Sequence, residues 1–155
     1  MTAIAAPGAQ TQPRHDAYES LIERCRSLEP VATAVAYPCE QTALTGAIEA
    51  AEARLIAPVL VGPRQKIREV AQEAELDIDP YPIEDVPDAH AAAAKAVELV
   101  RSAHAEALMK GSLHTDELMS AVVSSATGLR TGRRISHAFV MSVPTYPKPL
   151  VITDA

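Results

Sequence analysis

The chain has 155 residues, of which 48% are hydrophobic and 22% charged, so it can form an ordinary globular domain and broad disorder is excluded. Its 14 Lys and Arg against 20 Asp and Glu give a net charge of −6, which argues against binding a polyanion over the whole surface but leaves room for one local anion site. Aromatic residues make up 3% of the chain and Trp is absent, so there are few side chains on which nucleic-acid bases could stack. No run of about 18 apolar residues exists, so we expect no contact with a membrane.

The start of the chain and its cysteines indicate a cytoplasmic protein. The first residues have neither the basic start nor the long apolar stretch of a secretory signal. Two cysteines do not make a disulfide framework. Cys25 falls on the apolar side of a predicted helix. We expect Cys39 to be structural rather than a reactive thiol, because no basic residue adjoins it in sequence.

Short apolar runs alternate with helical periodicity from Val31 to Ser125, after a loose tail over residues 1–12. The predicted strands of this region are Val31–Tyr37, Leu55–Val61, a weaker edge strand within the proline-broken Ile78–Val86, and Ala107–Gly111. The predicted helices are Pro13–Leu28, Glu40–Arg54, Arg64–Glu75, Asp88 to about Ala105, and Asp116 to about Ser125. This alternation predicts an α/β fold, a parallel sheet flanked by helices on both faces.

Three polar or small residues predict helix ends. Asp88 is a natural N-cap for the alanine-rich helix, and Thr115 for the helix that follows it. Gly128 is expected to end that second helix as a C-terminal glycine.

The rhythm changes after Gly128, where strands Ser136–Val143 and Pro149–Thr153 have only the turn Pro144–Lys148 between them. The expected organisation is therefore a tail over residues 1–12, an α/β domain over 13–127, and the first strands of a second, truncated α/β subdomain over 128–155. The last strand stops at Asp154, where ligands bind in open α/β sheets. We therefore expect the front part of a longer protein. Asp154 is a possible cleft residue, although a lone Asp there is more often structural.

The densest group of chemically active residues is Gly128–His137. It supplies Arg130, Arg133, Arg134 and Ser136 within an otherwise acidic chain. Arginine forms forked, charge-assisted bonds to phosphate oxygens, and glycines let a backbone approach an anion. The segment predicts either a phosphate site or a solvated loop whose arginines pair with nearby carboxylates.

A second candidate is Met109–Thr115, which joins a strand to a helix start and contains Lys110, His114 and Thr115. Free backbone N–H groups there favour an anion. The acidic pair that follows would repel a phosphate, so an ordinary capped turn is an equal alternative.

Several sharper hypotheses fail. No two histidines stand at ligand spacing with a Cys or carboxylate, so no metal site is expected. The nucleotide patterns GxGxxG and GxxxxGK[ST] are absent, as is the hydrolase pattern GxSxG.

Five segments together resemble the phosphate acetyl/butyryl transferase family, most of all the phosphate acetyltransferase part of bifunctional enoyl-CoA hydratase/phosphate acetyltransferases. They are Glu29–Pro38, Ala57–Pro63, Ala107–Thr115, Gly128–His137 and Leu150–Ala155. The resemblance runs from about Ala17 to the end, and the order of the motifs makes it specific.

The resemblance implies acyl transfer between coenzyme A and phosphate, in a cleft between two α/β domains. Coenzyme A would be a substrate, with no cofactor bound permanently, and the full-length protein is expected to be a homo-oligomer. The two loops above would face the cleft and bind the CoA thioester, phosphate or acyl phosphate. The family's catalytic residues are expected beyond Ala155, so this portion should be inactive alone. Ser120 stands roughly where acetyl-type members carry an arginine, which leaves the acyl preference open.

The alternative hypothesis is a non-catalytic α/β module that binds CoA, a phosphate metabolite or a partner. A third possibility, a metal-dependent decarboxylating dehydrogenase, lacks a carboxylate cluster. The coding sequence after Ala155 would separate the first two.

Overall fold

The structure is a computed structural model, and it describes residues 16–143, 146 and 148–153. The chain forms two compact units, one spanning Cys25–Arg134 and the other combining the described residues up to Arg24 with those from Ile135 onward. The domain division predicted from the sequence, with a boundary near residue 128, stays a prediction for the whole protein.

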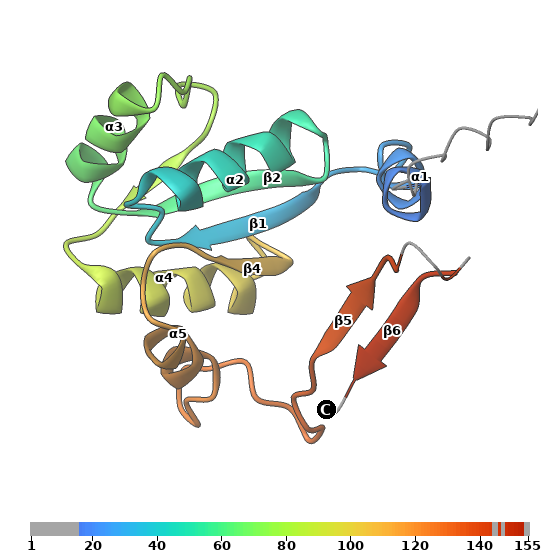
Figure 1. Ribbon diagram of the computed structural model, residues 1–155. Coiled ribbons are helices and arrows are strands. Elements are labelled where there is room, and N and C mark those ends of the chain that lie inside the picture. Colours follow the sequence, from blue (N-terminus) through green and yellow to red (C-terminus); the bar gives the residue numbers. More distant parts are fainter. Residues whose placement is uncertain (1–15, 144–145, 147, 154–155) are drawn as a thin grey trace, which may run out of the picture. The chain divides into compact units, whose positions relative to one another are not determined.

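The larger unit alternates strands and helices throughout, as the apolar runs predict (Figure 1). Its elements are β1 (Val31–Ala36), α2 (Gln41–Glu52), β2 (Ile56–Gly62), α3 (Arg64–Glu73), β3 (Ile83–Asp85), α4 (Ala89–Arg101), β4 (Ala107–Lys110) and α5 (Thr115–Val122).

The four strands form one parallel sheet in the order β3-β2-β1-β4, which confirms the predicted fold class. The short β3 lies at the edge, as the prolines that flank it predict. The central β1 pairs with β2 on one side and β4 on the other. Its residues Ala34, Val35 and Ala36 are fully buried because helices cover both faces.

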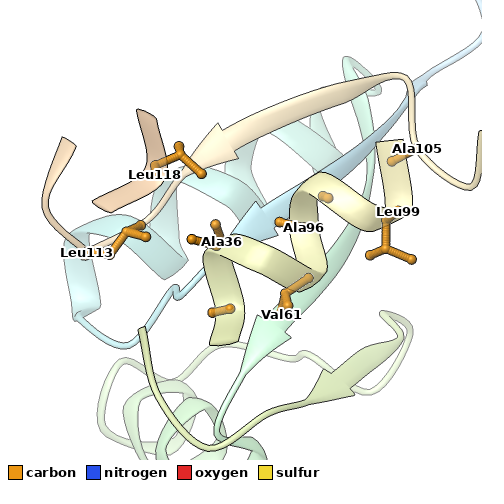
Figure 2. Packing of buried hydrophobic residues seen from close by; sticks show 10 residues of the cluster. Ala36, Val61, Ala96, Leu99, Ala105, Leu113 and Leu118 are labelled. Carbon is orange, nitrogen blue, oxygen red and sulfur yellow. The ribbon is translucent and has the colours of Figure 1, made fainter. Parts of the chain in front are cut away.

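Successive residues of each strand point to opposite faces of the sheet, so they pack into two separate hydrophobic cores, one on each face. Val35 and Leu60 pack with α2 and α3, above the sheet in Figure 1. Ala36 and Val61 pack with α4 and α5 on the opposite face, and Figure 2 shows these two residues among Ala96, Leu99, Ala105, Leu113 and Leu118. The small residues of β1 and α4 allow helix and sheet to approach closely.

Two of the three predicted helix ends are wrong. Asp88 is an N-cap as predicted, since its Oδ1 accepts a hydrogen bond of 2.8 Å from Ala91 N. The N-cap of α5, however, is His114 rather than Thr115, because the Glu117 carboxylate reaches back and accepts from His114 N at 2.9 Å.

The predicted role of Gly128 also fails, because α5 ends earlier, at Val122. Gly128 has no positive φ. It is needed instead for close approach, since a Cβ there would lie 2.4 Å from Val122 O and 2.5 Å from Ser124 O.

The smaller unit contains α1 (Asp16–Cys25) except its last residue, which belongs to the larger unit. It also contains the antiparallel pair β5 (Ala138–Met141) and β6 (Leu150–Thr153). The two predicted strands are therefore confirmed, while residues 144, 145 and 147 of the predicted turn lie outside the described residues. Phe139, Val140 and Val151 are 59%, 60% and 65% exposed. Among the described residues, no helix has the length and apolar character needed to cross a membrane.

Candidate functional site

The strand order places a topological switch point between β1 and β4. The chain leaves β1 toward β2 and β3, and later returns to the other side of β1 as β4. The helices α2 and α3 pack on one face and α4 and α5 on the other. Ligands of open α/β sheets bind at such a point, beyond the carboxyl ends of the strands. The segments that follow β1 and β4 therefore form the candidate site.

These two segments are in direct backbone contact, and Gly111 makes that contact possible. Gly111 N donates to Ala36 O at 2.9 Å. A Cβ on Gly111 would lie 2.5 Å from both Ala36 O and Tyr37 O. Any side chain here would push β1 and β4 apart.

Ser112 joins the two segments further. Its backbone N and its Oγ both donate to Tyr37 O, at 2.9 and 2.8 Å. The same Oγ accepts from Cys39 N at 3.2 Å. One serine thus fixes the turn that follows β1.

That turn has an unusual conformation and carries a cation. Tyr37 has φ 57°, in the left-handed region that bulky residues rarely adopt. Its hydroxyl lies 3.3 Å from Lys66 Nζ, and the ammonium lies 5.2 Å from the ring centroid. The hydrogen bond to Tyr37 is the largest cause that raises the pKa of Lys66, so this lysine stays charged.

A second cation in the first turn of α3 is already neutralised. Arg64 Nε lies 3.8 Å from Asp85 Oδ2, and its NH2 group donates to Ile83 O at 2.7 Å. Cations near a helix N-terminus are disfavoured by the dipole. Asp85 offsets that cost for Arg64. Among the described residues, Lys66 has no comparable carboxylate partner.

The structure brings Lys110, His114 and Thr115 together at the junction of β4 and α5. Lys110 is exposed at the end of β4, and its Nζ donates to Gly111 O at 3.2 Å and Leu113 O at 2.9 Å. His114 and Thr115 are exposed at the helix start. The lysine therefore organises the loop that bears the other two.

The arginine segment is exposed and has no regular secondary structure. Arg130, Arg133 and Arg134 belong to the larger unit, and within the described part of the chain their guanidinium groups form no hydrogen bond or ion pair. The described residues therefore do not show the alternative in which these arginines form ion pairs with nearby carboxylates. Ser136 belongs to the smaller unit, with its Oγ 3.2 Å from Thr153 Oγ1. Asp154 lies outside the described residues.

Cys39 is structural, in line with its expected role. It is 3% exposed, and burial is the largest cause that raises its pKa, from 9.0 to about 11. The nearby Lys66 lowers that pKa in part. A thiol of this kind is neutral at physiological pH and is a poor nucleophile. In the described part of the chain, no three His, Cys, Asp or Glu side chains are grouped so that they could hold a metal ion.

Sequence reasoning missed Tyr37, Lys66 and Ser112. In sequence, Tyr37 stands only as the end of a strand, although a tyrosine at that place is conspicuous in a chain with 3% aromatic residues. Lys66 lies in α3, and no local sequence pattern connects it with Tyr37, which follows β1. Ser112 was inside a loop already singled out, but its bonds to β1 depend on the order of the strands.

Comparison with known proteins shows strong similarity to one group of transferases. The chain is 60% identical over 138 residues to a phosphate acetyltransferase of Rhizobium meliloti, which covers 89% of this chain and 44% of that protein. It is 36% identical over 138 residues to a phosphate butyryltransferase of Clostridium beijerinckii, covering 89% of this chain and 46% of that protein. The chain thus spans less than half the length of these relatives. No family model matches the sequence.

The fold also matches a solved structure of the same group. A phosphotransacetylase from Streptococcus pyogenes superimposes with a TM-score of 0.69 at 13% identity, covering 86% of this chain and 50% of that one. At this identity the match supports the fold alone. Together with the relatives, it confirms the resemblance inferred from the motifs.

Proposed function

Since this chain is homologous to part of the phosphate acetyltransferases and phosphate butyryltransferases, we propose that it is the CoA- and phosphate-binding portion of a phosphate acyltransferase. The observation that carries the proposal is the 60% identity to a phosphate acetyltransferase over nearly the whole chain. The higher identity to the acetyltransferase than to the butyryltransferase favours an acetyl group among short acyl chains.

In the proposed reaction, the CoA thiol loses its proton and the thiolate attacks the carbonyl carbon of an acyl phosphate. A C–S bond forms, the C–O bond to phosphate breaks, and phosphate leaves with the bonding electron pair. A free cysteine thiol has a pKa of about 8.5, so a thiol such as that of CoA is mostly protonated at neutral pH and needs a base to form the thiolate. The main requirements are to neutralise the phosphate charge and to align the two substrates.

Exposed cations of this chain suit the first requirement. The guanidinium groups of Arg130, Arg133 and Arg134 have no partner in the described part of the chain and remain available for phosphate oxygens. The β4–α5 junction adds Lys110, His114 and Thr115 beside the switch point. Ser136 is a further candidate donor. The group that accepts the thiol proton is expected in sequence beyond Ala155.

The remaining features of the proposal follow the same homology. Coenzyme A serves as a substrate and no permanently bound cofactor is required. A cytoplasmic location and homo-oligomerisation of the full-length protein belong to the proposal as well, and cell fractionation and sedimentation of that protein would test them.

The test compares residues 1–155 with a protein extended by the coding sequence that follows. Both are given acetyl phosphate and CoA, and thioester formation is measured. We expect turnover by the extended protein and none by residues 1–155. Arg130→Ala or Arg133→Ala in the extended protein should weaken CoA or phosphate binding by about 1.5–3 kcal/mol. If the extended protein forms no thioester but binds CoA, the non-catalytic module is the correct alternative.

A further inference from the structure

The turn after β1 contains a backbone conformation that helix termination does not explain. Four non-glycine residues of the described chain have positive φ, namely Tyr37, Arg54, Glu75 and Ala103. The last three each follow the C-cap of a helix, and their N–H groups bond back to carbonyls of its last turn. That pattern is the ordinary Schellman ending. Tyr37 instead follows a strand.

Strain of this kind persists where the surrounding structure enforces it, and it concentrates at functional sites. Here Ser112 enforces it, through two hydrogen bonds to Tyr37 O and one from Cys39 N. The turn therefore belongs to the rigid edge of the sheet, next to the switch point. The side chain of this strained residue contacts Lys66 through its hydroxyl and its ring face.

Lys66 is a charged group that forms no ion pair among the described residues, although, after the hydrogen bond to Tyr37, the charge of the Glu40 carboxylate is one of the causes that raise its pKa. Tyr37 contributes a hydroxyl at 3.3 Å and a ring face at 5.2 Å, and neither carries a negative charge. Two other cations of the larger unit are paired, Arg64 with Asp85 and Lys95 with Glu84 and Glu98. An ammonium that is oriented but left exposed can still give hydrogen bonds to an anion.

We propose that Lys66, oriented by Tyr37, binds a phosphate group of the substrate at the carboxyl edge of the sheet. This rests on the proposed function, and it adds a substrate-binding residue outside both loops that the sequence motifs indicate. The phosphate belongs either to inorganic or acyl phosphate or to the nucleotide part of CoA. Lys66 is the contact residue, while Tyr37 and Ser112 are positioning residues.

The test measures binding to residues 1–155 by isothermal titration with two probes, inorganic phosphate and adenosine 3′,5′-bisphosphate. Lys66→Gln should raise the dissociation constant of one probe about tenfold, near the lower end of the cost of losing a charge-assisted bond. Tyr37→Phe keeps the ring but removes the hydroxyl, and it should raise the dissociation constant of the same probe about threefold. The probe that responds identifies which phosphate Lys66 contacts.

Arg68→Gln is the matched control, because Arg68 is an exposed cation on the same helix α3. It removes the same charge without touching Tyr37 and should leave binding within twofold of the unchanged chain. Equal losses in Arg68→Gln and Lys66→Gln, binding of neither probe to the unchanged chain, or unchanged binding in Lys66→Gln would overturn the proposal.

A kinetic measurement separates this proposal from the proposed function. In the extended protein, Lys66→Gln should raise KM for the responding substrate about tenfold and leave kcat within about threefold, whereas a merely structural role would leave KM unchanged. Acyl transfer with an unaffected KM would refute the role of Lys66 alone. Absence of acyl transfer in the unsubstituted extended protein would refute the proposed function, while the binding results would still decide the role of Lys66.

Discussion

Replacing Gly111 by alanine should disrupt the junction on which the candidate site is built. The added Cβ would lie 2.5 Å from Ala36 O, 2.5 Å from Tyr37 O and 2.6 Å from the Tyr37 carbonyl carbon. All three are backbone atoms of the central strand and the turn that follows it, so no flexible side chain can move aside. The strands β1 and β4 must separate at their carboxyl ends.

The expected cost has two parts. Overpacking a tight site costs about 1–3 kcal/mol. Separation of the strands also weakens the bond from Gly111 N to Ala36 O and the two bonds from Ser112 to Tyr37 O, each with a net value of about 1 kcal/mol. Partial loss of these bonds gives a total of about 2–4 kcal/mol, a large share of the stability of an ordinary domain.

Urea denaturation followed by circular dichroism measures this cost. For an m-value near 1.5–2 kcal/mol/M, a loss of about 3 kcal/mol lowers the midpoint by roughly 1.5–2 M. Gly46→Ala is the matched control, since Gly46 lies within α2 and has nothing within 4 Å of an added Cβ. It should stabilise by about 0.5–1 kcal/mol. A Gly111→Ala midpoint equal to that of the unchanged chain would show that the close contact has been misread.

Four further predictions concern the side chains of Ser112, Asp88 and the two cysteines. Ser112→Ala removes the bridge between Tyr37 O and Cys39 N, so the free energy of unfolding in urea should fall by about 1–3 kcal/mol, whereas Ser112→Thr should retain part of it. Asp88→Ala should cost about 1 kcal/mol and Asp88→Asn much less, because asparagine can still cap α4; equal losses would contradict the capping role. The raised pKa of Cys39, about 11 against 9.0 for a free thiol, means that the folded chain holds this proton more tightly. The resulting stabilisation is complete below about pH 9 and is lost as the pH rises through about 11, so the unfolding midpoint should fall over that range less steeply in Cys39→Ala than in the unchanged chain. Mass spectrometry at pH 8 should find that iodoacetamide labels the half-buried Cys25 well before Cys39, and equal rates would refute the burial argument.

Local patterns were sufficient to predict the elements of the larger unit. The apolar run at β1 and the prolines around β3 determine which strand is central and which is marginal, because burial and loss of N–H donors act locally. Asp88 is predictable for the same reason, since a cap bonds to residues only a few positions away.

Features that depend on contacts distant in sequence could not be predicted in this way. The adjacency of Val31–Tyr37, Leu55–Val61 and Ala107–Lys110 in one sheet is expected from the alternation of strands and helices, but no single run of residues encodes the strand order that places β4 beside β1. The roles of Tyr37 and Ser112 follow from that placement. Gly128 was misread because a glycine required for close approach looks the same in sequence as one that ends a helix. The arginine segment was found from its composition alone, but its position relative to the β4–α5 junction was not predictable.

The most direct test of the central claim is a heteronuclear NMR titration of residues 1–155 with CoA and, separately, with inorganic phosphate. We expect the largest chemical-shift changes in the backbone amides that follow β1 and β4, at Tyr37, Gly111 and Ser112, together with Arg130 and Arg133. Absence of any change, or changes confined to the groove between α4 and α5 near His90 and Arg101, would contradict a phosphate-binding role for the carboxyl edge of the sheet.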